Sequence, residues 1–315
     1  MNMGSGEMLS SPPCVVTGAF GFSGQEIANR LLARGECVRT LTNHPKQESP
    51  LFGRVQVCPL DFTNIDQLSK SLEGSSVLYN TYWVRFPYGD LTHERAVENT
   101  KALIRAAEAA GLTRIVHVSI TNPSPDSPLT YFRGKAELES TIRNSALSYA
   151  ILRPAVLFGH GDILINNIAF MLKRFPVFPI PGSGQYRVQP IFVGDLAQLA
   201  VESGCRSDSY IQDAVGPEAY TYADSVKMIR SAVGSRSLLV PTPAAAVRLA
   251  SAVLGLFLND VVLTNEEIKG LMADLLVSQN TPMGRTSLKE WISRHASEIG
   301  ATYASELQRH YMGNI

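Results

Sequence analysis

The sequence predicts an α/β fold built on a doubly wound parallel sheet, with a smaller and mostly helical lobe toward the C-terminus. From Cys14 onward, short β-branched runs alternate with segments of helical period, which is typical of βαβ units. A glycine-rich turn follows the first of these runs directly. After Pro154 the alternation stops, and from Pro217 the chain is mostly of helical period.

The elements of the first half follow in order. A helix after the glycine-rich turn carries Ile27, Ala28 and Leu31 on one face and ends near Gly35. Two longer helices are expected over 93–110 and 131–144, because their apolar residues recur at helical spacing. The runs that we expect to form the first six strands are 14–16, 37–42, 55–60, 76–82, 114–119 and 148–153.

The second half is less regular. Four prolines and two glycines between 175 and 190 predict irregular backbone there. Strands are expected over 188–193 and 210–215, with Asp195 capping a helix between them. The helical lobe follows from Pro217, and we find no internal repeat.

The composition excludes several classes of protein. The chain has 315 residues, with 28 Lys and Arg against 28 Asp and Glu, so its formal net charge is zero. A neutral chain offers no electrostatic footprint for nucleic acid or for an anionic membrane. With 45% hydrophobic and 18% charged residues, the chain is expected to be globular. Its most apolar stretch, 249–258, is too short for a membrane span.

The four cysteines show neither C-x-x-C pairing nor metal-ligand spacing with the six histidines, so no metal site is expected. Three of them lie in apolar, strand-like runs, which favours buried free thiols and a reducing compartment. Residues 1–13 are small and polar, so we expect a flexible leader and no signal peptide. A cytoplasmic protein is the resulting expectation.

The glycine-rich turn has the context that a dinucleotide site requires, between a predicted strand and a predicted helix. Gly18 permits a tight turn, Gly21 lets the backbone approach a pyrophosphate, and Gly24 lets the helix pack on the strand. The start of the helix, with Phe22 and Ser23, then faces the anion. Glycines also mark ordinary turns, but the strand–turn–helix order favours a Rossmann-type cofactor site.

The residues at the end of the second strand are expected to determine whether the protein prefers NAD or NADP. An acidic residue there would hold the ribose 2′-hydroxyl of NAD, but none is present between Leu41 and Lys46. A 2′-phosphate would not be repelled, and Asn43, His44 and Lys46 could donate hydrogen bonds to it. We therefore expect NADP(H) to be preferred, with NAD(H) possible because no arginine stands there.

Ser119, Tyr131 and Lys135 form the strongest chemical pattern. Tyr131 and Lys135 are a Y-x-x-x-K pair on a predicted helix, so the phenol and the ammonium are neighbours. A phenol has a pKa of about 10, which an adjacent cation lowers toward the range that proton transfer requires. Ser119 ends the fifth strand, where its hydroxyl could polarise a carbonyl oxygen. A core tyrosine explains many such pairs, but the glycine-rich turn upstream favours catalysis.

These motifs occur in the order seen in the extended and atypical short-chain dehydrogenases/reductases, which include NAD-dependent epimerases and dehydratases, and most of residues 14–235 resemble that superfamily. Val215 to Glu218 also resembles the NADPH-binding subunit of respiratory complex I. The segments that carry the resemblance are the G-x-x-G-x-x-G turn, His117–Ser119, Tyr131 with Lys135, Leu152–Pro154, Phe158–Gly159 and Gln189–Asp195.

The resemblance implies roles for particular residues. Ser119, Tyr131 and Lys135 would be catalytic, and Lys135 would also hold the cofactor ribose. Asp61 and Phe62 match the position that contacts adenine, although a strand-end cap explains Asp61 nearly as well. Asn99 matches a position sometimes used for hydrogen bonding in the active site. Taken together, the residues expected to contact the cofactor are Gly18, Gly21, Phe22, Ser23, Gly24, Asn43, His44, Asp61, Phe62, Lys135 and Pro154.

The domain division follows from the same elements. We expect a dinucleotide-binding domain over 14–160, completed by 188–216. Residues 161–187 and 217–315 would form the substrate lobe. 

Departures from the family pattern disfavour nucleotide sugars as substrates. Related epimerases carry an arginine where this chain has Val188, and Arg187 lies one residue out of register, on the other face of a strand. An apolar, aromatic pocket is expected instead, with core packing as the alternative for each ring and a solvent loop for the histidine. The residues expected to line the pocket are Tyr82, Trp83, Phe86, Tyr88, Phe158 and Phe178, with His160 and Asp162 at its mouth.

Two functions stay open at this point. The first is a soluble oxidoreductase that transfers hydride between NADP(H) and a carbonyl or alcohol carbon of a small, fairly apolar substrate. The second is a non-catalytic NADP(H)-binding subunit or redox sensor that acts through a protein partner. The apolar region of Val247, Leu249, Val253, Leu254 and Leu258 would serve as its contact surface, although buried core is the favoured interpretation. No nucleic-acid partner is expected, and a homodimer is left open.

Overall fold

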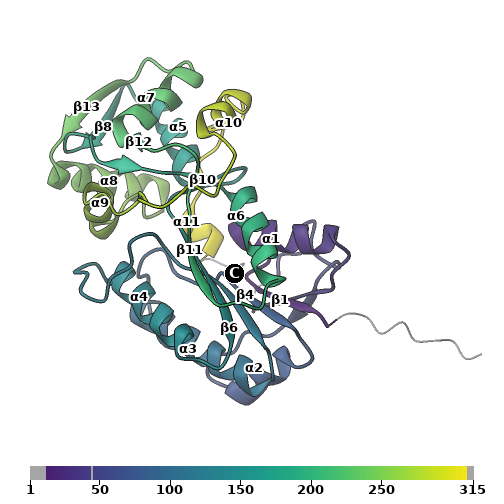
Figure 1. The fold of residues 1–315 in the computed structure, drawn as a ribbon. Helices are drawn as coiled ribbons and strands as arrows, with labels where there is room; N and C mark the ends of the chain where they lie inside the picture. The colour runs from purple at the N-terminus through teal and green to yellow at the C-terminus, as the bar shows by residue number, and fades with distance from the viewer. Residues whose placement is uncertain (1–11, 44, 311–315) are drawn as a thin grey trace, which may run out of the picture.

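The structure is a computed structural model that describes residues 12–43 and 45–310. Its centre is a seven-stranded parallel sheet with the order β11-β6-β5-β4-β1-β2-β3, which confirms the predicted fold class (Figure 1). The expected leader, 1–13, lies almost wholly outside the described residues. The strands of this sheet are β1 Cys14–Thr17, β2 Val38–Leu41, β3 Gln56–Cys58, β4 Val77–Asn80, β5 Arg114–Val118, β6 Ser148–Pro154 and β11 Tyr210–Ala214.

Helices cover both faces of the sheet, as Figure 1 shows. Alternate strand residues face opposite sides, so Val16 and Tyr79 pack toward one layer of helices while Val15 and Leu78 pack toward the other. One layer holds α1 Phe22–Ala33 and α6 Val193–Gly204, and the other holds α2 Ile65–Leu72, α3 His93–Ala109 and α4 Thr130–Arg143. The strand order reverses between β1 and β4, and in such sheets ligands bind outside the carboxyl ends of the strands at that point.

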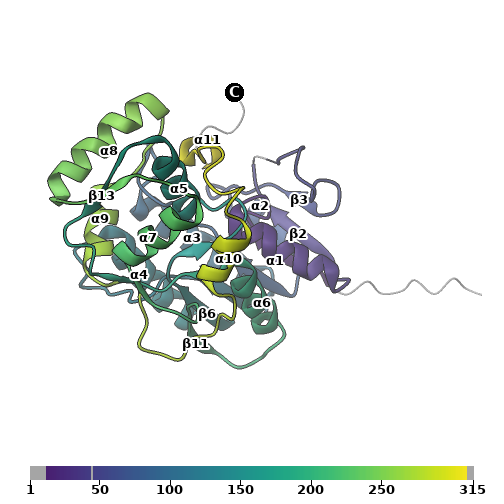
Figure 2. The ribbon, with the colours of Figure 1, turned by 90° about the horizontal axis from the view of Figure 1, so that it is seen from above.

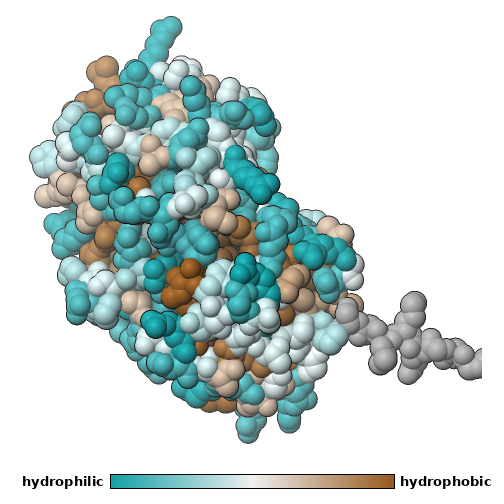
Figure 3. Space-filling view, in the orientation of Figure 1, coloured by the Kyte–Doolittle hydropathy of each residue, from teal (hydrophilic) through white to brown (hydrophobic). Residues whose placement is uncertain are grey.

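A second core lies in the C-terminal lobe, around Ile168, Val226 and Ile292. In the space-filling view, hydrophobic surface residues gather mostly where the upper and lower parts of the molecule meet (Figure 3). Short strand pairs join β7 to β10, β8 to β13 and β9 to β12. The strands of the lobe and its border are β7 Leu157–Phe158, β8 Val177–Pro181, β9 Arg187–Val188, β10 Ile191–Phe192, β12 Tyr220–Thr221 and β13 Leu238–Thr242; the helices are α5 Leu164–Arg174, α7 Tyr222–Ala232, α8 Ala244–Leu258, α9 Asn265–Met272, α10 Leu288–Arg294 and α11 Glu306–His310.

Two local expectations are wrong. The proline-rich segment 175–190 contains strand β8, which is compatible with proline because a two-stranded sheet consists only of edge strands. Asp195 does not cap α6; Phe192 holds the N-cap position, and Asp195 lies in the first turn. Its carboxylate instead accepts hydrogen bonds from the backbone N–H groups of Arg285 and Thr286, both at 2.7 Å, and so joins the sheet domain to the lobe.

The cysteines also differ from expectation. All four are free, but Cys14 alone is buried, whereas Cys37 and Cys205 are exposed and Cys58 is half-buried. Cys37 precedes the first residue of β2 and Cys205 follows the last turn of α6, so neither lies inside a packed element. Burial raises the pKa of the Cys14 thiol to about 11.

Helix α8 presents an apolar face to its surroundings. Val247 is buried, but Leu249, Leu256 and Phe257 are 67%, 84% and 83% exposed, and Val253 is also exposed. Figure 2 shows this helix at the rim of the molecule. The expectation of a buried core is therefore wrong for Leu249 and Val253, because only one side of α8 meets the lobe, whereas Leu254 and Leu258 are half-buried. Within the described residues, no helix combines the length and the apolar character that crossing a membrane requires.

Candidate active site

The glycine-rich turn packs against itself too tightly for side chains. Gly18 has a φ of +66°, and the N–H of Gly21 donates to its carbonyl at 2.8 Å. A Cβ at Gly24 would meet the Gly18 carbonyl oxygen at 2.2 Å, so only glycine fits there. Gly21 holds the N-cap position of α1 with no side-chain cap, and Phe22 and Ser23 begin the helix. The residues present therefore fit a pyrophosphate at this helix N-terminus.

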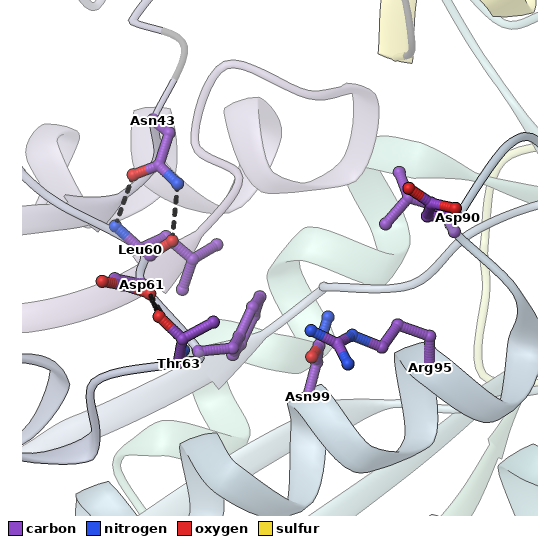
Figure 4. A pocket seen from close by; sticks show the side chains of 9 residues that line it. Asn43, Leu60, Asp61, Thr63, Asp90, Arg95 and Asn99 are labelled. Atoms are coloured by element: carbon purple, nitrogen blue, oxygen red, sulfur yellow. Dashed lines mark hydrogen bonds between the residues drawn. The ribbon is translucent and has the colours of Figure 1, made fainter.

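A cleft of about 490 Å³ opens beside the ends of β2 and β3 (Figure 4). Asp61 and Phe62, expected at the adenine, both line it. The Asp61 carboxylate accepts from the backbone N–H and the hydroxyl of Thr63, and these bonds lower its pKa. The Asn43 side chain exchanges two hydrogen bonds with the backbone of Leu60, so its amide is engaged in holding the loop. His44 lies outside the described residues.

Arg95 lines the same cleft, and sequence analysis did not identify it. It stands in the first turn of α3, and Figure 4 shows its side chain lying beside Asn99 at the side of the cleft opposite Asn43. The side chain of Asn99 donates to the phenol oxygen of Tyr82 at 2.8 Å, and the Tyr82 ring packs at a tilt against Phe62. No motif marks Arg95, because only the packing of α3 beside the β3 loop places its charge there.

Tyr131 and Lys135 share one aromatic neighbour, Trp83, from the loop between β4 and α3. The ring of Tyr131 meets that of Trp83 edge-on, with 5.4 Å between the centroids. The ammonium of Lys135 lies 4.4 Å from the centroid of the Trp83 ring, which is a cation–π contact. His93 stacks on the indole at 5.7 Å. The structure thus brings the two motif residues to a common point at the carboxyl ends of the strands.

Lys135 is buried, and its Nζ donates to the carbonyl of Val118 at the end of β5, at 2.9 Å. Burial lowers the pKa of this ammonium to about 7, against an opposing effect of Glu139. The side chain is therefore only partly charged near neutrality. A lysine in this state exchanges protons at physiological pH, which few lysines do.

The phenol of Tyr131 is protonated at neutral pH. Burial, together with the negative charge of Glu267, raises its pKa above the usual value of a phenol. Its hydroxyl makes no hydrogen bond to another residue in the described part of the chain. The ring is held by contacts with Trp83, His93 and Phe132.

The hydroxyl of Ser119 points to a buried carboxylate that sequence analysis missed. It donates to Oε1 of Glu139 at 2.6 Å, and Glu139 also receives two hydrogen bonds from Arg153, at 2.9 and 2.5 Å. Glu139 lies one helical turn after Lys135 on α4. The spacing was visible in the sequence, but a carboxylate four residues after a lysine is common on exposed helix faces.

A row of polar side chains crosses β1, β4 and β5 close to this point. The hydroxyl of Thr17 donates to Asn80, whose amide lies 3.0 Å from Nδ1 of His117. With Nδ1 accepting, the proton of the neutral ring is assigned to Nε2. That nitrogen is buried without a partner in the described residues, as is Nε1 of Trp83. Burial and the nearby Lys135 hold the pKa of His117 well below its usual value.

The residues expected to line the substrate pocket lie in different parts of the structure. Tyr82 and Trp83 belong to the site just described. Phe158 is fully buried in the core of the C-terminal lobe, where it packs on Phe192 and Trp291 instead of lining a pocket. His160 is exposed and contacts rings of that lobe. Of the remaining four, Phe86, Phe178 and Asp162 are buried and Tyr88 is exposed. Pro154, the last residue of β6, accepts a hydrogen bond from the N–H of Thr121 through its carbonyl.

Comparison with known proteins agrees with this architecture. Residues 18–163 match a family described as NAD(P)H-binding. The 40 kDa subunit of mitochondrial NADH-ubiquinone oxidoreductase from Neurospora crassa is 26% identical over 289 residues, which cover 88% of this chain and 75% of that protein. Sterol demethylase protein B of Methylococcus capsulatus is 30% identical over 225 residues, covering 62% of this chain and 68% of that protein.

Solved structures share the fold. An NADPH-dependent quinone oxidoreductase from Escherichia coli, complexed with NADPH, superposes with a TM-score of 0.72. The match covers 89% of this chain and 99% of that one, at 18% sequence identity. 

Proposed function

Because this chain belongs to the extended short-chain dehydrogenase/reductase family and binds NAD(P)H, we propose that it transfers hydride between NADP(H) and a carbonyl or alcohol carbon. The observation that carries this proposal is the convergence of Tyr131 and Lys135 on Trp83, at the carboxyl ends of the strands. That edge of the sheet is where the glycine-rich turn also lies.

The cofactor is proposed to extend from the glycine-rich turn toward Lys135. The Gly18–Gly24 turn would hold the pyrophosphate, and the cleft lined by Asp61, Phe62 and Arg95 would hold the adenosine part. When bound, the nicotinamide donates or accepts the hydride. Arg95 would offer its guanidinium to a phosphorylated ribose, although the carboxylates of Asp61 and Asp90 line the same cleft.

The residues of the chain would handle the proton. Tyr131, protonated at neutral pH, is suited to donate its proton to the carbonyl oxygen of a substrate during reduction. Lys135 would stabilise the phenolate that is left, because its ammonium lies one helical turn away. Ser119 would orient the carbonyl oxygen only after its hydroxyl turns away from Glu139.

The substrate is proposed to be small and fairly apolar. Tyr82 and Trp83 present aromatic surface beside the proton donor, and apolar rings recognise apolar ligands. One relative is a sterol demethylase protein, which supports a compound of this class. The free thiols of the chain support a reducing compartment such as the cytoplasm.

The residue after β2 is expected to decide the preference between cofactors. Thr42 is half-buried, and its backbone N–H donates to the carbonyl of Cys58, so the position is held in place. The parent protein is expected to bind NADPH more tightly than NADH. Thr42→Asp would place a carboxylate against the 2′-phosphate and weaken NADPH binding on the order of tenfold or more.

Titration of intrinsic fluorescence with both cofactors measures this preference, and Thr42→Asn is the neutral control of matched size. Tighter binding of NADH than of NADPH by the parent protein would overturn the proposed preference without any variant.

A screen of carbonyl compounds tests the proposed reaction. Each compound is mixed with the full chain and NADPH or NADH, and oxidation of the nicotinamide is followed by its absorbance. Turnover of an apolar ketone or aldehyde is expected, with nucleotide sugars inactive. Binding of cofactor without turnover of any compound would contradict the reductase proposal.

A second candidate function is a non-catalytic NAD(P)H-binding subunit or redox sensor. Two observations favour it: the Ser119 hydroxyl is already committed to Glu139, and α8 exposes Leu249, Leu256 and Phe257. One relative is a subunit of a larger oxidoreductase. A partner protein or a second copy of the chain would then cover α8.

A further inference from the structure

We propose that His160, His295 and Glu298 bind a divalent transition-metal ion of the zinc class. Each residue offers one ligand atom, and these atoms all lie within 4.8 Å of one another. They come from two segments far apart in the sequence: the loop after β7 and the turns that follow α10. Spacing along the chain could not reveal this site, because only the packing of the lobe brings His160 to the other two.

The ring of His295 is oriented as in metal-bound histidines. Its Nδ1 lies 2.8 Å from the backbone carbonyl of Trp291, so this nitrogen carries the proton and donates. Nε2 then keeps its lone pair and is available to a metal. The ring also stacks on Trp291, with 4.6 Å between centroids and 24° between planes. Trp291 is buried and packs against Phe158, so the His295 ring rests on a side chain that is itself held in place.

His160 stands on a loop whose next two residues, Gly161 and Asp162, are held by hydrogen bonds. The buried carboxylate of Asp162 accepts from the backbone N–H of Ile165 at 2.7 Å. Arg309 donates to the carbonyl of Gly161 at 2.6 Å. The His160 ring meets that of His295 edge-on, with 4.5 Å between centroids. The loop thus places its imidazole beside the second histidine without further folding.

Glu298 completes the set with an oxygen 3.5 Å from Nδ1 of His160. Two imidazoles and one carboxylate are a ligand set that zinc and its neighbours accept, with water in the remaining position. Ligands at bonds of about 2.1 Å lie roughly 3.4 Å apart around a tetrahedral ion. Small rotations of His160 and Glu298, both exposed, therefore close the site.

This site is separate from the proposed hydride transfer. The described contacts of His160 are with Trp291, His295 and Glu298, none of which touches Tyr131 or Lys135. A bound ion would join the loop after β7 to the turns after α10 and so brace the C-terminal lobe. The ordinary alternative is a surface ion pair between protonated His160 and Glu298, worth little in stability.

Calorimetric titration of the chelator-treated full chain with zinc ion tests the proposal. One equivalent of zinc is expected to bind, more tightly at pH 8 than at pH 6 because imidazole binds a metal only when deprotonated. His160→Gln and Glu298→Gln should each weaken binding at least tenfold, since loss of a ligand costs no less than loss of a supporting contact. Glu290→Gln, an exposed carboxylate on α10 paired with Arg294, is the matched control and should bind as the parent does.

Cobalt ion gives an independent readout, because four-coordinate Co²⁺ absorbs visible light far more strongly than the hydrated ion. The absorption is expected with the parent and the Glu290→Gln control, and its loss is expected in the two ligand variants. Absence of saturable zinc binding would overturn the proposal and leave the surface ion pair. Undiminished binding in both ligand variants would place the ion elsewhere and overturn it equally.

Discussion

A Tyr131→Phe variant is expected to bind NADPH as the parent does while losing turnover by a factor on the order of 10² to 10⁴. The substitution removes one hydroxyl, which makes no hydrogen bond to another described residue, and keeps the ring. The contacts of that ring with Trp83 and His93 should therefore persist, and stability should hardly change. The measurement is kcat on a substrate found in the carbonyl screen, with cofactor affinity and the unfolding midpoint determined in parallel.

The control for this variant is Tyr149→Phe, a phenol on strand β6 that plays no part in the proposed chemistry. It should retain full turnover. If Tyr131→Phe kept the activity of the parent, the proton would come from another group and the Y-x-x-x-K pair would be a feature of helix packing. A deficit in cofactor binding as large as the deficit in turnover would point to a structural role instead.

Replacing Lys135 by Met is expected to stabilise the folded protein near neutral pH, by an amount that shrinks as the pH rises. In the parent, burial lowers the pKa of Lys135 from 10.5 to about 7. Between these two values the unfolded chain binds a proton that the folded chain does not, so the stability of the parent rises with pH. The stability difference between variant and parent should therefore fall by about 3 kcal/mol from pH 7 to pH 9.5.

Urea unfolding at several pH values measures this difference. Lys101→Met is the matched control, because Glu137 and Glu98 raise the pKa of Lys101 and leave it charged throughout this range. A pH-independent difference for Lys135→Met would show that the ammonium is not desolvated in the folded protein. The same variant should also bind NADPH less tightly if Lys135 holds the ribose.

The first half of the fold could be predicted because its patterns are local. Strands β1, β5 and β6 end within a residue or two of the expected bounds. Short β-branched runs between glycines are typical of buried parallel strands, so the sequence indicates them directly. The prediction of irregular backbone in the proline-rich segment was wrong. Whether a strand tolerates proline depends on its pairing, and the partner of β8 is β13, about sixty residues later. The exposure of α8 was hidden for the same reason: an apolar helix has the same sequence whether or not something covers it.

The candidate site divides in a similar way. Sequence motifs identified Tyr131 and Lys135, because i and i+4 neighbours on a helix meet whatever the rest of the chain does. The motifs did not identify Arg95 or Glu139, and they did not show that Trp83 lies over Lys135. The expectation that Phe158 lines a pocket is wrong, because Phe158 packs in the core of the C-terminal lobe. Each of these depends on the approach of two elements that are distant in the sequence.

By itself, therefore, the sequence determined the parallel sheet, the glycine-rich turn and the tyrosine–lysine pair, since each rests on periodicity or spacing within one strand–helix unit. The tertiary structure alone decided the charge state of Lys135, because desolvation depends on what covers the ammonium, and Trp83 comes from another loop. It alone also turned the Ser119 hydroxyl toward Glu139 and brought His160 to His295. Burial and cross-chain contact are properties of the packed molecule, and no local pattern encodes them.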